Sequence, residues 1–175
     1  NVEKAIGVEH EFVVINNLDN QYNMNQAYNK GARNAKYPCL VFVHEDVLFL
    51  TEKWGIALLE LLQKTEIGAV GVAGSNYLNE RGIWAEAGIP FIKGRLVHQE
   101  GEKLFLSTYS EERKDAEVVV LDGVFLACRK EIAEKIPFDE TLDGFQLYDA
   151  DWSLRVAQKH EVIVTQKILL LHKSY

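Results

Sequence analysis

Hydrophobic and polar positions along the chain alternate between the period of buried strands and the period of amphipathic helices. Short apolar runs that end in Asn, Asp, Gly or Pro predict strands, and apolar residues recurring every three or four positions predict helices. The order strand, helix, strand, helix, strand predicts an α/β fold with a mixed, mostly parallel, doubly wound sheet flanked by helices. The predicted strands are 11–17, 39–49, 68–74, 118–121, 124–128, 162–164 and 168–172, and the predicted helices are 24–35, 51–64 with Thr51 as N-cap, 131–135 and 149–159.

The segment 75–117 departs from this regular alternation and has the character of an insertion. Two short apolar runs, 95–98 and 103–106, flank the sequence Glu-Gly-Glu at 100–102. Glycine between two alternating runs is a hairpin signal, so we expect a β-hairpin here. This segment and the loop 137–147 are where we expect substrate specificity to be determined.

Composition limits the class of protein. A chain of 175 residues, 47% hydrophobic and 26% charged, is expected to form one domain over residues 1–175. The net charge of −7, without a Lys/Arg cluster interleaved with aromatics, argues against nucleic-acid binding. Cys39 and Cys128 lie alone in apolar runs, which indicates a reducing, cytoplasmic environment, and no apolar run has the length of a transmembrane segment.

The apolar run that begins at Cys39 ends in His44, Glu45 and Asp46 before the chain becomes apolar again. A run of β-branched and aromatic residues predicts a strand buried on both faces. Open α/β sheets bind their ligands at the carboxyl ends of such strands. Imidazole and carboxylate groups bind metals and protons, so the sequence predicts a ligand site at this edge.

Structural interpretations of the candidate residues remain open at this point. Asp149 at the start of a predicted helix is a natural N-cap. Glu45 and Asp46 suit a solvated turn, and His172 near the end of the chain suits a hydrogen-bonded surface histidine. Trp84 is as suited to core packing as to stacking on a sugar ring. The pair Asp122-Gly123, which interrupts an apolar run, is also compatible with a β-bulge.

The order of four motifs resembles the GT-A glycosyltransferases, and in particular the glycosyltransferase family-two-like proteins. The resemblance covers roughly residues 11–172, and four features in the right order are more specific than any one of them. The first and the last features are a short acidic motif after a strand and a late histidine. The four are His44-Glu45-Asp46 where most of the family has Asp-x-Asp, the Asp-Gly strand and basic residue at 121–130, the Phe-Asp-Glu of 138–140 with the Asp-x-Asp of 148–155, and His172.

The resemblance implies an inverting glycosyltransferase of the hexosyltransferase type. Such an enzyme moves a sugar from a nucleotide-diphosphate donor, expected to be a UDP-sugar, to an acceptor hydroxyl. It implies Asp149 as the general base, with Asp151 orienting it or holding the acceptor. It also implies a divalent cation, Mn2+ or Mg2+, held by Asp46, His44 and His172, and the imidazole ligands favour Mn2+.

The remaining roles that the resemblance implies concern the two substrates. Asn16 and Asn17, with Glu45 and Asp46, are expected to contact the donor nucleotide. The acceptor and sugar region is expected at Asp122, Gly123 and Trp84. The family has a further strand before the first one predicted in this chain, so we expect an incomplete nucleotide pocket in this sequence. The expected location is the cytoplasm, at the inner face of a membrane.

Two other functions stay open. A non-catalytic GT-A-like module that binds a glycan or a partner would account for His44 in the place of the family's Asp. A nucleotidyltransferase on a related fold is less favoured, because no Gly-rich, basic phosphate loop follows a predicted strand. Replacing Asp149 by Asn separates the glycosyltransferase from the binding module, because only a transferase depends on this carboxylate for turnover.

Overall fold

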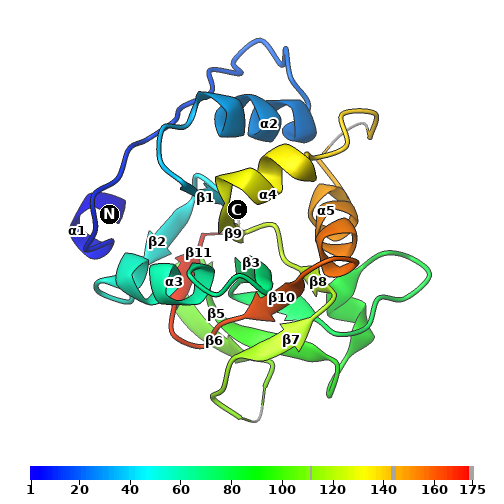
Figure 1. The fold of residues 1–175 in the computed structure, drawn as a ribbon. Helices are drawn as coiled ribbons and strands as arrows, with labels where there is room; N and C mark the ends of the chain where they lie inside the picture. The colour runs from blue at the N-terminus through cyan, green and yellow to red at the C-terminus, as the bar shows by residue number, and fades with distance from the viewer. Residues whose placement is uncertain (111, 143–144, 174–175) are drawn as a thin grey trace.

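The structure is a computed structural model that describes residues 1–110, 112–142 and 145–173. Its centre is formed by two β-sheets with helices packed around them (Figure 1). The first sheet has the strand order β1 (Cys39–Val43), β9 (Phe125–Arg129), β3 (Ile67–Gly71), β10 (Glu161–Val164) and β7 (Ala116–Val118). The second has the order β2 (Val47–Phe49), β11 (Leu170–His172), β5 (Ile92–Glu100), β4 (Ala73–Ser75) and β8 (Val120–Leu121), with β6 (Lys103–Thr108) paired to β5.

The α/β class is confirmed, but the expectation of a mostly parallel sheet is wrong. Among the strands of the described residues, only β3 with β10 and β5 with β11 pair in parallel. The reason is β9, which lies between β1 and β3 and runs antiparallel to both. β1 and β3, which precede and follow helix α3 (Trp54–Leu62) in the first sheet, therefore run in the same direction without being neighbours.

The predicted strand 39–49 is divided in two. β1 belongs to the first sheet and β2 to the second, so the turn at residues 44–46 carries the chain from one sheet to the other. The predicted strand 68–74 divides in the same way into β3 and β4. Polar or glycine residues at both places permit the change of direction, which the apolar pattern alone does not reveal.

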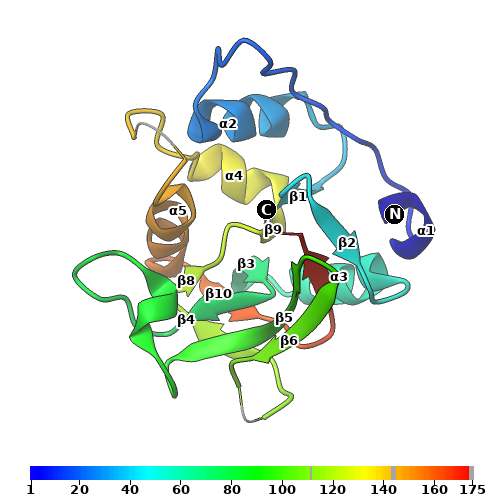
Figure 2. The same ribbon diagram turned by 180° about the vertical axis from the view of Figure 1, so that it is seen from behind.

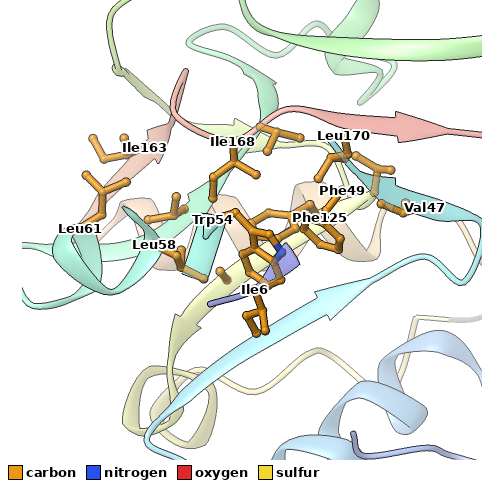
Figure 3. Close-up of a cluster of buried hydrophobic side chains, with 14 of the residues drawn as sticks. Ile6, Val47, Phe49, Trp54, Leu58, Leu61, Phe125, Ile163, Ile168 and Leu170 are labelled. Carbon is orange, nitrogen blue, oxygen red and sulfur yellow. The ribbon is translucent and has the colours of Figure 1, made fainter. Parts of the chain in front are cut away.

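Helices cover both faces of the first sheet. On one face lie α2 (Met24–Asn34), α4 (Lys130–Lys135) and α5 (Tyr148–Ala157), whose apolar residues pack with alternate residues of the strands. On the other face lie α3 and α1 (Val2–Ala5), where Trp54 stacks on Phe49 with ring centroids 4.1 Å apart (Figure 3). Burial of these two apolar faces is the main stabilising contribution to such a layered fold.

The N-termini of α2 and α3 differ in how well the sequence predicts them. α2 begins at Met24, as predicted, and a capping box closes its start: the Asn23 side chain accepts from the Gln26 N–H, and the Gln26 side chain accepts from the Asn23 N–H. Thr51 does not cap α3, which is a correction. Lys53 is the N-cap, with φ of 56°, while the Thr51 hydroxyl accepts a hydrogen bond from the Leu169 N–H.

The prediction of a buried strand at 11–17 is wrong. No strand is formed there, and Phe12 and Val14 are 57% and 84% exposed. An apolar run becomes a buried strand only beside a pairing partner, and none of the described strands pairs with this segment. The Glu11 carboxylate, which accepts hydrogen bonds from the N–H groups of Lys36 and Tyr37, ties the segment to the chain before β1.

The predicted hairpin is confirmed and is longer than expected. β5 and β6 pair from Arg95 opposite Thr108 to Glu100 opposite Lys103, and they lie together along one side of the molecule (Figure 2). The short 3-10 helix η1 (Trp84–Ala87) precedes them. Within the part of the chain that the structure describes, no helix combines the length and the apolar character of a membrane span.

Candidate active site

Three side chains that could hold a metal ion meet where the two sheets join. His44 directly follows β1, Asp46 directly precedes β2, and His172 is the last residue of β11. Since β2 and β11 are paired with Val47 opposite His172, the turn and the far end of the chain lie side by side. The three residues are called the His–Asp–His group below.

The distances within the His–Asp–His group suit a divalent ion. His172 Nε2 lies 3.5 Å from His44 Nδ1 and 3.4 Å from Asp46 Oδ1. One donor atom from each of the three residues lies within 4.8 Å of the others, and all three residues are partly buried. Two imidazole nitrogens and a carboxylate oxygen form a donor set for divalent metal ions. The residues present therefore fit the implied cation.

Asp149 lies next to this group at the start of α5. Its Oδ2 accepts a hydrogen bond of 2.8 Å from the Gly123 N–H, and its Oδ1 accepts one of 2.9 Å from the Ala150 N–H. The N-cap of α5 is Leu147, so the capping interpretation of Asp149 does not hold. Burial raises the pKa of Asp149 above its ordinary value, while these N–H groups and nearby His44 oppose the rise.

Asp122 adds a second carboxyl group to the same region. Its Oδ1 accepts a hydrogen bond of 2.9 Å from the Val124 N–H. Burial raises the pKa of Asp122 to about 6; the charge of Asp149 adds to the rise, and His172 opposes it. Carboxyl groups with raised pKa values beside imidazole groups are typical of sites that move protons.

Tyr148 connects α5 to the His–Asp–His group. Its hydroxyl lies 2.9 Å from Nε2 of His44, and its ring packs edge-on against the Tyr28 ring with centroids 5.6 Å apart. Tyr148 is buried, and it reaches His44 because residue 123 has no side chain. A Cβ atom at Gly123 would lie only 2.0 Å from the Tyr148 hydroxyl oxygen.

Trp84 is linked to the His–Asp–His group through the hairpin. Its ring packs edge-on against Tyr109 with centroids 5.9 Å apart, and the Tyr109 hydroxyl lies 3.3 Å from His98 Nε2. The His98 and His172 rings lie 6.5 Å apart, as neighbours on paired strands. Burial and the nearby His172 lower the pKa of His98, whose imidazole borders the site from the insertion.

The other predicted site residues make local contacts. The Asp151 carboxylate accepts hydrogen bonds of 2.9 and 2.6 Å from the Arg155 guanidinium, one turn along the same helix. The Asn17 side chain exchanges two hydrogen bonds with the backbone of Tyr22, which closes the turn before α2. Asn16 and Glu45 are exposed, and Glu45 is not a member of the His–Asp–His group.

Sequence reasoning missed three residues around the site: Tyr148, Tyr28 and His98. Tyr148 directly precedes Asp149, and Tyr28 falls on the apolar face of α2, so both have the pattern of core aromatics. The polar use of their hydroxyl groups depends on the neighbours that the fold supplies. His98 lies on β5, one of the two strands of the hairpin, and the pairing of β5 with β11 places it beside His172.

Comparisons with known proteins agree with this architecture. A family model described as a glycosyltransferase-like family matches residues 1–170. The chain is similar in fold to the crystal structure of GalNAc-T7 with UDP, GalNAc and Mn2+, with a TM-score of 0.62 and 11% sequence identity. The match covers 88% of this chain and 30% of that one, so the present chain spans under a third of its length. No curated protein matches the chain. The expected GT-A-type fold is confirmed.

Proposed function

Because the chain belongs to the glycosyltransferase-like family whose model spans residues 1–170, we propose that it transfers a sugar from a nucleotide-diphosphate donor to an acceptor hydroxyl. The donor class that we propose is a UDP-sugar, and the proposed cation is Mn2+. The presence of UDP, GalNAc and Mn2+ in the crystal structure of GalNAc-T7 supports both choices.

The observation that carries the proposal is the meeting of the His–Asp–His group with Asp149. His44 and His172 are 128 positions apart in the chain, yet their ring nitrogens lie 3.5 Å apart. Core packing gives no reason to bring two imidazoles and a carboxylate together at a partly open position. A cation site beside a general base is what transfer from a diphosphate donor requires. The place of His44 in this group also weakens the alternative of a non-catalytic module.

In the proposed reaction, Asp149 accepts the proton of the acceptor hydroxyl while that oxygen forms a bond to the anomeric carbon of the sugar. The bond between the anomeric carbon and the diphosphate oxygen breaks on the opposite side, which inverts the configuration. The N–H groups of Gly123 and Ala150 hold the Asp149 carboxylate in place, and each oxygen retains a lone pair for the proton. When bound, the cation supplies positive charge that neutralises the departing diphosphate.

The remaining assignments are also proposals. Asn16, Asn17, Glu45 and Asp46 contact the donor nucleotide and diphosphate. The acceptor and its sugar are bordered by Asp122, Gly123 and Trp84, and Asp151, two residues along α5 from Asp149, holds the acceptor. The enzyme works in the cytoplasm, at the inner face of a membrane.

A donor panel with Mn2+ tests the proposal. Donor binding is measured by calorimetry, and hydrolysis or transfer is measured by release of the nucleoside diphosphate. Asp149→Asn is expected to keep donor affinity and to lose turnover. Glu134→Gln, which neutralises an exposed carboxylate on α4, is the matched control and should keep both. Full turnover in Asp149→Asn, or donor binding without turnover across the panel, contradicts the proposal.

A further inference from the structure

We propose that Tyr148, assisted by Tyr28, is a positioning residue that makes Nδ1 of His44 the metal-binding nitrogen. The proposal deepens the His–Asp–His group and rests on its proposed role as a cation site. It assigns a function to two packed tyrosines, Tyr148 buried and Tyr28 partly buried, that the transfer reaction itself does not use.

The two ring nitrogens of His44 face different surroundings. Nδ1 faces Nε2 of His172 at 3.5 Å, and that same Nε2 lies 3.4 Å from Asp46 Oδ1. Nε2 of His44 faces the other way, toward the Tyr148 hydroxyl at 2.9 Å. Only Nδ1 therefore points to the place where the other two donor atoms converge.

The proton on His44 decides whether Nδ1 can bind a cation. A neutral imidazole carries one proton, and the nitrogen that binds a metal must be the one without it. The proton must then be on Nε2, where it is donated to the Tyr148 oxygen. A hydrogen-bond partner on the second nitrogen is the usual way in which proteins fix the tautomer and the orientation of a metal-binding histidine.

Tyr28 allows the His44 proton to stay on Nε2. A phenol has one proton to donate, and a Tyr148 proton donated to Nε2 would force the His44 proton onto Nδ1. The Tyr28 hydroxyl, on a ring packed edge-on against Tyr148, offers that proton another acceptor. In the proposed arrangement, His44 Nε2–H donates a hydrogen bond to the Tyr148 oxygen, and Tyr148 O–H donates one to the Tyr28 oxygen.

Packing holds both phenols in place. Tyr148 is 4% exposed and fills the space that Gly123 leaves open. The Tyr28 ring contacts the rings of Phe42, Phe138 and Tyr148, with centroids 4.9, 5.2 and 5.6 Å away. Side chains confined in this way lose little further freedom when the cation binds, which favours affinity.

Mn2+ binding measured by calorimetry without donor tests the proposal. Tyr148→Phe is expected to weaken Mn2+ binding about 10- to 100-fold, the effect usual for a hydrogen-bond partner of a metal-binding histidine. Tyr28→Phe should weaken it less, because the Tyr148 hydroxyl remains. Tyr109→Phe is the matched control, since it removes a hydroxyl beside His98, a histidine outside the His–Asp–His group, and should leave Mn2+ binding unchanged.

The tautomer of His44 is a second measurement that needs no variant. Nitrogen chemical shifts of the metal-free wild-type protein should show His44 protonated on Nε2, and Tyr148→Phe should show a mixture of the two tautomers. Wild-type His44 protonated on Nδ1, or unchanged Mn2+ affinity in a folded Tyr148→Phe variant, overturns the proposal. A wild-type protein that does not bind Mn2+ overturns instead the cation site of the proposed function.

Discussion

Replacing Gly123 by Ala should perturb the His–Asp–His group and Asp149 together. The added Cβ would lie 2.0 Å from the Tyr148 hydroxyl oxygen and 2.6 Å from the ring carbon that carries it. Ordinary van der Waals contact begins at 3.4 Å, so the Tyr148 side chain must move by more than an ångström. Such a movement breaks the 2.9 Å hydrogen bond to His44, and any compensating shift of the backbone displaces the N–H that holds Asp149.

The magnitude follows from two contributions. Overpacking a buried site costs about 1–3 kcal/mol. Leaving a buried hydrogen-bonding group without its partner costs about another 1–3 kcal/mol. We therefore expect the free energy of unfolding of Gly123→Ala to fall by about 2–6 kcal/mol, which in a domain of this size lowers the Tm by about 4–24 °C. Mn2+ affinity should fall as well.

The assay is urea unfolding and thermal unfolding of the metal-free protein, followed by calorimetry with Mn2+. Gly31→Ala is the matched control, because a Cβ at this helical position meets nothing within 4 Å. It should increase the free energy of unfolding by about 0.5–1 kcal/mol through the helix preference of alanine. A Gly123→Ala protein with wild-type stability and wild-type Mn2+ affinity would refute the placement of Tyr148 against Gly123.

Three further predictions concern the site. Asp149→Asn should lower kcat by about 10²- to 10⁴-fold at unchanged donor affinity. Steady-state kinetics measures kcat and calorimetry measures the affinity. A much smaller fall in kcat would show that Asp149 is not the general base. His172→Ala should abolish Mn2+ binding seen by calorimetry, whereas His160→Ala, outside the His–Asp–His group, should not; equal binding in both excludes His172 as a ligand. The raised pKa of Asp122, about 6, means that the folded protein holds this proton more tightly than the unfolded chain. The contribution of Asp122 to the free energy of unfolding of the metal-free protein is therefore full below about pH 4 and is lost as the pH rises through 6, by about 3 kcal/mol in urea unfolding. Asp122→Asn should flatten that profile, and an unchanged profile would contradict the assignment.

Much of the site could be predicted from the order of motifs, because each motif lies at the end of an element that local patterns identify. The meeting of His44 and Asp46 with His172 follows from this order together with the expected fold. Strand direction could not be predicted, because the apolar run 124–128 has the same pattern whether its strand pairs in parallel or antiparallel. The buried strand expected at 11–17 failed for a related reason, since a local pattern does not contain the neighbour that would bury it.

The tyrosines show a second limit of sequence reasoning. Tyr28 and Tyr148 are apolar at their rings and polar at one atom, and hydrophobic periodicity registers only the rings. Their hydroxyl groups gain a role through His44, which is 16 positions from one and 104 from the other. The absent side chain at Gly123 gives no signal in the sequence either, although it admits Tyr148 to the site.

The turn at residues 44–46, which passes from the first sheet to the second, has a consequence for unfolding. His44 is attached to β1 of the first sheet, whereas Asp46 and His172 are attached to β2 and β11 of the second. A cation bound by all three acts as a cross-link between the sheets and closes a loop between residues 128 positions apart. Ligand binding to the folded state alone raises its stability by mass action. Loading with Mn2+ should therefore slow amide exchange in strands of both sheets together, so that the protein responds as one cooperative unit.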